Sequence, residues 1–256
     1  MPRWTDRFSI EGRTALVTGA SSGIGYEIAT VFADAGARVL ATGQNEVALS
    51  KLKTQIQSDA GDCHTVAADL TTTEGAERLA NAALEHFGRV DILVNSAGTA
   101  IVGPAVDYDI ADWDQTMALN LRAPFILSKR LAPQMMAAKR GKIINISSQT
   151  GVIALPDHAA YAASKAGLNG LTKALMTEFA PHNIQVNAIC PTVVLTEMGK
   201  TLWSPPEKSE PFLAATPLGR FGEPVEIADM ALYLASPSSD LVNGALLMIE
   251  GGYSSV

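Results

Sequence analysis

Apolar residues along the chain alternate between short continuous runs and longer stretches with helical spacing. One helical stretch has apolar residues at positions 24, 28, 31, 32 and 35 and ends at Gly36. The short runs predict seven strands, at residues 14–18, 38–42, 63–68, 90–95, 142–147, 184–189 and 245–249. Strand and helix therefore alternate along the whole chain.

The strand-like runs are continuously apolar, which is typical of a sheet that is covered on both faces. Connections that contain a helix of about 10 to 15 residues force neighbouring strands to be parallel. The pattern predicts an α/β fold with a doubly wound, seven-stranded parallel sheet and helices on both faces. Residues 1–256 contain no repeat and no linker, so we expect a single domain.

The alternation breaks once, over residues 199–218, where prolines stand at positions 205, 206, 211 and 217. We interpret this segment as an irregular insertion between a strand and a helix. Long segments of this kind commonly act as mobile lids over a site. The insertion is therefore expected to be lid-like.

Composition excludes several classes of protein. A 256-residue chain with 47% hydrophobic and 18% charged residues is neither disordered nor a disulfide-stapled mini-protein. Its formal net charge of −7 has the wrong sign for neutralising nucleic-acid phosphates. The first seven residues are too polar for a signal peptide, and no run approaches the ~18 apolar residues of a membrane span, so we expect a cytoplasmic protein.

The cysteines and histidines suggest no redox or metal chemistry. Cys63 and Cys190 both lie in apolar stretches, where a buried free thiol is expected, although two cysteines can in principle pair. His64, His86 and His182 are dispersed and lack partners at metal-ligand spacing. A catalytic metal is therefore not indicated.

A glycine-rich loop follows the first predicted strand and leads directly into the first helix. Residues 18–25 read Thr-Gly-Ala-Ser-Ser-Gly-Ile-Gly. Glycines allow a tight turn and close backbone approach, and the N-terminus of the helix offers unpaired N–H groups to a pyrophosphate. A simple glycine turn is the alternative, but the position between strand and helix favours a dinucleotide site.

Tyr161 and Lys165 are one helical turn apart, on the same face of a predicted helix. A phenol has an ordinary pKa of ~10, and a nearby ammonium can stabilise its phenolate. Ser148 follows the fifth strand, where a hydroxyl can polarise a substrate oxygen. Asn120 lies in the helical stretch that follows the fourth strand and its Asn95-Ser-Ala-Gly98 end. All of these groups map to one edge of the predicted sheet.

In these motifs the sequence resembles the short-chain dehydrogenase/reductase family over essentially the whole chain. The resemblance implies a single-domain Rossmann fold and a catalytic set of Asn120, Ser148, Tyr161 and Lys165. Tyr161 would then be the general acid/base, and Ser148 would hold the reacting oxygen. Lys165 would lower the phenol pKa and hold the nicotinamide ribose, while Asn120 would steady a water that relays protons through Lys165.

The resemblance also implies the residues that bind the cofactor. Asp69 and Leu70 look like the family's adenine-pocket pair, and Val194 and Thr196 look like its carboxamide contacts. The full cofactor set is Gly19, Ser21, Ser22, Gly23, Ile24, Gly25, Thr42, Gly43, Gln44, Asp69, Leu70, Asn95, Ala97, Gly98, Tyr161, Lys165, Val194 and Thr196.

Two departures from the family pattern stand out. Ser96 replaces a second Asn, which keeps a hydrogen-bonding side chain. Thr192 follows Pro191 at a position where the family usually has Gly. With this threonine, the segment from residue 191 to 199 is similar to the L-xylulose reductase (dicarbonyl reductase) subgroup. The subgroup resemblance implies a substrate pocket of Ser148, Gln149, His158, Tyr161 and Trp203. His158 as a plain loop histidine and Trp203 as a lid anchor remain open alternatives.

The choice of cofactor is set at the end of the second strand. An acidic residue there receives the ribose hydroxyls of NAD, and a basic residue receives the extra phosphate of NADP. This chain has neither, because the stretch from 41 to 45 reads Ala-Thr-Gly-Gln-Asn. Thr42 and Gln44 could accommodate a phosphate, which favours NADP slightly over NAD.

The leading hypothesis is an oxidoreductase that transfers a hydride between NAD(P)(H) and a secondary alcohol or ketone of a small sugar, polyol or dicarbonyl. A 3-oxoacyl-thioester reductase is one alternative, for which the basic candidates are Arg122, Lys129 and Arg130. A non-catalytic nucleotide-sensing protein is another. The helix from Tyr161 carries more apolar positions than one stripe needs, and together with the family resemblance this predicts a homotetramer.

Overall fold

Seven parallel strands form the centre of the protein, in the order β3-β2-β1-β4-β5-β6-β7. A computed structural model describes residues 3–256, and residues 1 and 2 of the N-terminal stretch considered above lie outside it. The strands are β1 (Thr14–Val17), β2 (Arg38–Gly43), β3 (Asp62–Ala67), β4 (Ile92–Asn95), β5 (Gly141–Ile146), β6 (Ile184–Pro191) and β7 (Leu246–Ile249). Each overlaps a predicted strand, and the predicted fold is confirmed.

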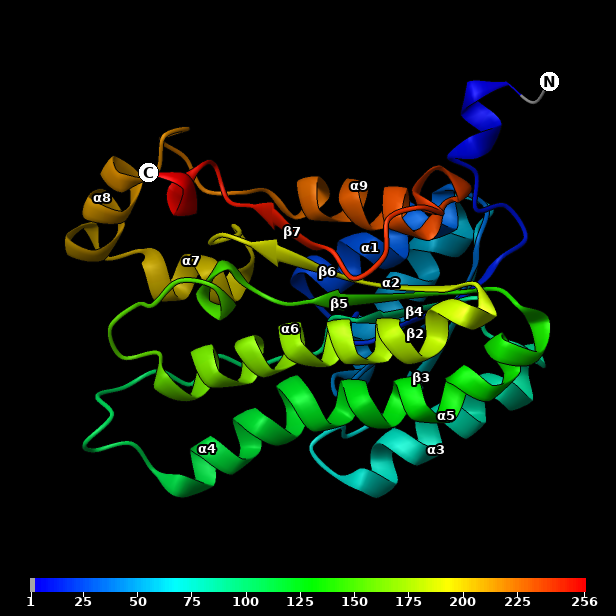
Figure 1. Cartoon of the computed structure of the whole chain (residues 1–256), viewed down its shortest axis with the longest axis horizontal. Coiled ribbons are helices and arrows are strands. Elements are labelled where there is room, and N and C mark those ends of the chain that lie inside the picture. The colour runs from blue at the N-terminus through cyan, green and yellow to red at the C-terminus, as the bar shows by residue number, and fades with distance from the viewer. Residues whose placement is uncertain (1–2) are drawn as a thin grey trace.

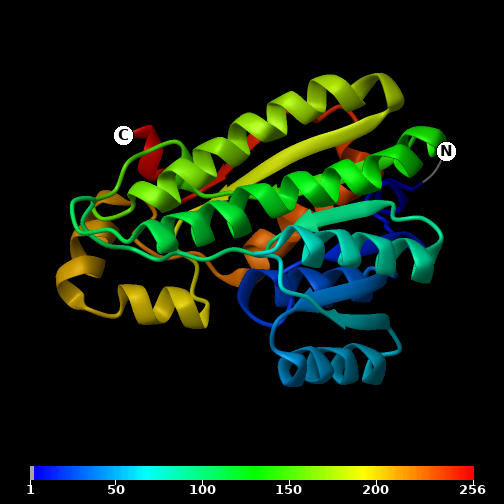
Figure 2. The same cartoon turned by 90° about the horizontal axis from the view of Figure 1, so that it is seen from below.

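Helices cover both faces of the sheet (Figures 1 and 2). They are α1 (Gly23–Asp34), α2 (Glu46–Ser58), α3 (Thr73–Phe87), α4 (Ile110–Met117), α5 (Ala123–Ala138), α6 (Ala159–Phe179), α7 (Glu197–Trp203), α8 (Pro206–Ala215) and α9 (Pro224–Ala235). One buried apolar cluster joins the sheet to α1, α2 and α9, and a second joins it to α3, α5 and α6. Strands β1, β2, β4, β5 and β6 are largely apolar because each has buried residues in both clusters.

The strand order reverses between β1 and β4, which are neighbours in the sheet. The segments that leave these two strands run to opposite faces, so a crevice opens at their carboxyl ends. The glycine-rich loop follows β1, the Asn95–Gly98 segment follows β4, and Ser148 follows β5. The fold therefore brings the predicted chemical groups to one edge of the sheet.

The segment 199–218 is not irregular as predicted, because most of it lies in helices α7 and α8. Pro206 occupies the start of α8, where a missing N–H costs nothing. Phe212 is the buried residue of α8, and it stacks on Tyr253 with ring centroids 4.7 Å apart. Figure 1 shows α7, α8 and the C-terminus together at one end of the molecule. Aromatic packing, which the prolines conceal in the sequence, holds this segment in helical form.

Two further expectations concern cysteines and membranes. Cys63 and Cys190 are free and buried, as predicted. Among the described residues, no helix combines the length and the apolar character that crossing a membrane requires.

Candidate active site

A cavity of about 360 Å³ lies at the carboxyl edge of the sheet, between the glycine-rich loop and helix α7. Most of the predicted site residues line it, and they come from loops far apart in the sequence. The predicted residues in its wall are Gly19, Ser21, Ser22, Gly23, Ile24, Gly25, Gly43, Gln44, Leu70, Ala97, Gly98, Ser148, Gln149, His158, Tyr161, Lys165, Val194, Thr196 and Trp203.

The turn between β1 and α1 is built so tightly that only glycine fits. Gly19 has a φ of +69°, and a Cβ there would lie 2.8 Å from the Cα of Ala97. A Cβ on Gly25 would lie 2.5 Å from the carbonyl oxygen of Gly19. Within the described chain, the Ser22 side chain makes no capping hydrogen bond at the start of α1. The first N–H groups of α1 therefore face the cavity uncapped, an arrangement that fits a pyrophosphate.

Thr18 ties the end of β1 to the end of β4. Its hydroxyl oxygen accepts hydrogen bonds from the backbone N–H groups of Ser96 and Ala97, each at 3.0 Å. Asn95, by contrast, does not line the cavity. Its side-chain amide donates to Asn145 Oδ1 at 2.8 Å, so it links β4 to β5 inside the sheet. The Asn95 side chain therefore lies outside the cavity wall, and a cofactor contact of Asn95 stays a prediction.

Asn120 lies in a short π-helical turn, Ala118–Arg122, between α4 and α5. Its Oδ1 accepts from Thr99 N, and its Nδ2 donates to Thr99 O, both at 2.9 Å. Nδ2 also donates to Ser164 Oγ on α6 at 3.0 Å. Asn120 is buried behind the cavity wall, where it fixes the segment after β4 against the helix that carries Tyr161 and Lys165.

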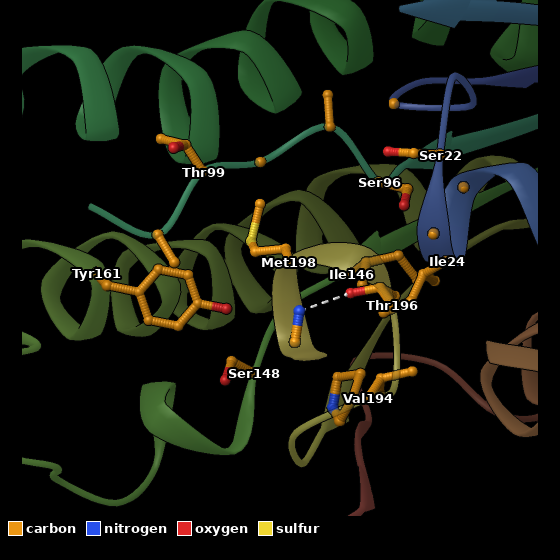
Figure 3. Close-up of a pocket in the computed structure, with 18 of the residues that line it drawn as sticks. Ser22, Ile24, Ser96, Thr99, Ile146, Ser148, Tyr161, Val194, Thr196 and Met198 are labelled. Atoms are coloured by element: carbon orange, nitrogen blue, oxygen red, sulfur yellow. Dashed lines mark hydrogen bonds between the residues drawn. The ribbon is translucent and has the colours of Figure 1, made fainter. Parts of the chain in front are cut away.

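Tyr161, Lys165 and Ser148 meet at the inner end of the cavity. Figure 3 shows the Tyr161 phenol and the Ser148 hydroxyl facing the same space, with Met198 of α7 across from them. Lys165 Nζ lies 5.7 Å from the centre of the Tyr161 ring and donates to Ile146 O at 2.8 Å. The three groups that the sequence separates by up to 17 positions therefore form one cluster.

Burial dominates the electrostatics of this cluster. It raises the pKa of Tyr161, and the hydrogen bond with Ser148 opposes that rise only in part. Burial also lowers the pKa of Lys165 to about 8. Burial therefore sets the direction of the phenol pKa, because removing water from a phenolate is costly. The pKa-lowering role of Lys165 stays a prediction.

The pKa of Lys165 predicts a specific pH dependence of stability. The folded pKa of about 8 lies below the ordinary 10.5, so the folded protein binds fewer protons than the unfolded chain between pH 8 and pH 10.5. Its unfolding free energy should thus rise across this window, by about 3 kcal/mol relative to Lys165→Met. Denaturant unfolding of both proteins at pH 7.5 and 10.5 measures the difference. Parallel pH curves for the two proteins would contradict the assignment.

The outer part of the cavity has polar groups on an apolar wall. Gln149 is 1% exposed, and neither atom of its carboxamide has a hydrogen-bond partner among the described residues. The His158 ring lies edge-on to Tyr161 with centroids 6.2 Å apart. Trp203 lines the cavity, and its ring centroid lies 4.6 Å from that of Phe212, the buried residue of α8. The apolar wall that the sequence analysis missed consists of Leu155, Val193, Met198 and Leu202.

The end of the cavity at Gly43 and Gln44, where the sequence predicts the adenosine of a cofactor, carries little charge. Gln44 Nε2 donates to Asp69 Oδ1 at 3.2 Å. Hydrogen bonds from Thr71 and Gln44 lower the pKa of Asp69, which lies beside a neighbouring groove. Thr42 is fully buried and outside the cavity wall, so of the two residues predicted to receive a phosphate, Gln44 is the one that lines the cavity. Lys165 is the one lysine or arginine in the described cavity wall, and it lies at the opposite end.

Comparisons with known proteins agree with this geometry. The family model described as enoyl-(acyl carrier protein) reductase matches residues 19–254. The chain belongs to the short-chain dehydrogenase/reductase family. It is 42% identical over 247 residues to a D-threitol dehydrogenase of Mycolicibacterium smegmatis, covering 96% of this chain and 95% of that protein. It is 38% identical over 245 residues to an L-xylulose reductase of Mesocricetus auratus, covering 95% and 97%.

A solved structure is similarly close. A putative NAD(P)-dependent gluconate 5-dehydrogenase from Beutenbergia cavernae, with bound NADP at low occupancy, superposes with a TM-score of 0.94 at 37% identity. The match covers 98% of this chain and 100% of that one. This short-chain dehydrogenase/reductase is therefore an NAD(P)-dependent oxidoreductase that acts on CH–OH groups. The resemblance to the family and to its L-xylulose reductase branch is confirmed.

Proposed function

We propose that the protein interconverts a secondary alcohol and a ketone in a small polyol or ketose. The observation that carries this proposal is the pair of hydroxyls of Tyr161 and Ser148, which face the same space in the cavity (Figure 3). Two hydroxyls at one point can bind the oxygen of an alcohol or of a carbonyl group. The names of the D-threitol and L-xylulose relatives support the same substrate class.

The roles proposed for the catalytic residues follow from their positions. In the reductive direction, the Tyr161 phenol donates its proton to the carbonyl oxygen, which Ser148 also binds. Lys165 is a buried ammonium near this phenol, and it stabilises the phenolate that remains. Asn120 positions α6 through Ser164. A nicotinamide cofactor, when bound, supplies or accepts the hydride at the same carbon.

The preference between the two cofactors is part of the proposal. Ser21, Ser22, Gly43 and Gln44 border the region where the adenosine ribose would lie, and none of them carries a charge. A site without a carboxylate does not repel a 2′-phosphate, and a site without a cation does not attract one. We therefore propose that the protein uses both cofactors, with a slight preference for NADP.

The two alternative functions have less support. An acidic acyl carrier needs basic residues at the cavity mouth, but Arg130 donates to Asn81 Oδ1 at 2.7 Å and Arg122 donates to the carbonyl of Thr71. Neither of them lines the cavity, and nor does Lys129. A nucleotide sensor would not need the cluster of Ser148, Tyr161 and Lys165.

Initial rates with NADH and NADPH test the proposal. The panel consists of L-xylulose and other ketoses, the matching polyols, diacetyl and acetoacetyl thioesters. We expect kcat/KM for at least one ketose to exceed that for the thioesters more than tenfold. Faster turnover of the thioesters would replace the proposal by the acyl-carrier alternative. Cofactor binding without turnover of any compound would favour the non-catalytic nucleotide sensor instead.

We also propose how the subunits assemble, where the protein is located and what residues 199–218 do. On α6, Ala166 and Ala174 remain exposed and Leu171 is half-buried, which leaves apolar surface for a partner subunit. We propose a homotetramer in the cytoplasm, consisting of one domain per chain. Residues 199–218 act in it as a lid over the substrate.

A further inference from the structure

A short 3₁₀ turn, Gln149–Gly151, follows Ser148 and binds both of its oxygen atoms. The backbone N–H of Gly151 donates to Ser148 O at 3.0 Å, and the N–H of Thr150 donates to Ser148 Oγ at 3.1 Å. The hydroxyl that shares a space with the Tyr161 phenol (Figure 3) is therefore oriented by this turn. Where the turn lies relative to helix α6 sets where Ser148 lies relative to Tyr161.

The turn lies directly against the backbone of α6. A Cβ on Gly151 would lie 2.9 Å from the carbonyl carbon of Lys165 and 2.8 Å from Asn169 Nδ2. Just before the turn, Ser147 Oγ donates to Lys165 O at 3.2 Å. The turn and the helix therefore approach each other more closely than a side chain at position 151 would allow.

Asn169 holds the turn from the side of α6. It is 5% exposed, and it stands one helical turn after Lys165, on the helix face that also carries Tyr161. Its Nδ2 donates to Gly151 O at 3.2 Å, and its Oδ1 accepts from the Cys190 thiol at 3.8 Å. Both ends of this carboxamide are thus bound by the protein, and Asn169 lies outside the cavity wall.

We propose that Asn169 is a positioning residue, which fixes the Ser148 hydroxyl relative to the Tyr161 phenol by holding Gly151 against α6. This inference rests on the proposed function, because it needs Ser148 and Tyr161 to bind the same substrate oxygen. A hydroxyl stabilises a reacting oxygen only within about 2.7–3.1 Å of it. Without the Asn169 contact the turn can move away from α6, and the Ser148 hydroxyl moves with it. Asn169 therefore acts on the reaction through Ser148.

A double-mutant cycle tests this role with the compound that the wild type turns over fastest, whatever its class. Asn169→Leu keeps a side chain of similar shape and removes the hydrogen bond, so kcat should fall about 10-fold. In the Ser148→Ala background the same substitution should lower kcat less than about 2-fold, because the hydroxyl that it positions is already absent. The affinity for NADPH should stay close to that of the matching parent in both backgrounds.

Two further variants separate positioning from general stability. Gly151→Ala disturbs the same contact from the other side, and its effect on kcat should likewise disappear in the Ser148→Ala background. Thr172→Val is the matched control, because the Thr172 hydroxyl oxygen accepts from Asn145 Nδ2 at 2.9 Å and so joins α6 to β5 instead of to the turn. This variant should lower the unfolding temperature but leave kcat within about 2-fold of the wild type.

Amide hydrogen exchange over residues 148–153 tests the contact without turnover. Asn169→Leu should speed exchange in this segment about 10-fold relative to Thr172→Val, since the turn loses its bond to α6. Equal losses of kcat with and without the Ser148 hydroxyl would overturn the inference, and so would unchanged exchange in the turn. If the wild type turns over none of the compounds, the proposed function fails, and the exchange rates alone decide whether Asn169 holds the turn.

Discussion

Replacing Tyr161 by phenylalanine should reduce kcat/KM about 1,000-fold, because a positioned acid/base group contributes about 10²- to 10⁴-fold. The substitution removes one oxygen atom and keeps the ring that packs beside His158. Fold and cofactor affinity should therefore stay close to those of the wild type. Initial rates with the best ketose, together with cofactor titration by fluorescence, measure the two effects separately.

The control for this variant is Tyr233→Phe, which makes the same chemical change on α9, outside the cavity wall. It should leave the rate within twofold of the wild type. If Tyr161→Phe folds, binds the cofactor and turns over at a near-normal rate, then Tyr161 is not the proton donor. That result would contradict the role of Tyr161 as acid/base, but it would not affect the proposed cofactor site.

The sequence located this cluster because its chemistry is tied to strand ends. Ser148 comes directly after a continuously apolar run, and carboxyl ends of parallel strands share one edge of a sheet. Tyr161 and Lys165 share a helix face through their spacing alone. Neither inference needs knowledge of a tertiary contact. In the structure, the side chains of Tyr161 and Lys165 lie next to each other.

Two of the predicted cofactor residues lie outside the cavity wall for a common physical reason. Asn95 and Thr42 lie on strands whose two faces are both buried, so no alternation of polar and apolar residues shows which way each side chain points. Asn95 stands beside Asn145 in the sheet register and bonds to it there. Both residues are at strand ends, but only the fold determines that their side chains turn away from the cavity.

Other features of the site depend on burial, which the sequence does not show. The direction of the Tyr161 pKa follows from how much protein surrounds the phenol. The unpaired amide of Gln149 becomes visible only when every neighbour has been placed. The helical form of residues 199–218 depends on Phe212 packing against Tyr253, 41 positions later in the chain.

Replacing Gly25 by alanine should weaken cofactor binding at least 100-fold, a loss of about 2.7 kcal/mol. The added methyl would lie 2.5 Å from the Gly19 carbonyl oxygen and 2.9 Å from that of Thr18, both backbone atoms. The loop can accommodate it only by moving, and that displaces the N–H groups that start α1. Fluorescence titration with NADPH and NADH measures the affinity, and thermal unfolding measures the cost to the fold.

Gly170→Ala is the control, because Gly170 is also helical and a Cβ there would meet nothing of its own chain within 4 Å. Gly170 lies on the α6 surface proposed for a partner subunit, so light scattering checks that the variant keeps the wild-type mass. Alanine is favoured over glycine inside a helix by about 1 kcal/mol, so this variant should be as stable as the wild type or more so. Both variants replace a helical glycine by alanine, so the difference between their cofactor affinities reports the clash in the turn. If Gly25→Ala kept its affinity for both cofactors, the first turn of α1 would not be where the pyrophosphate binds.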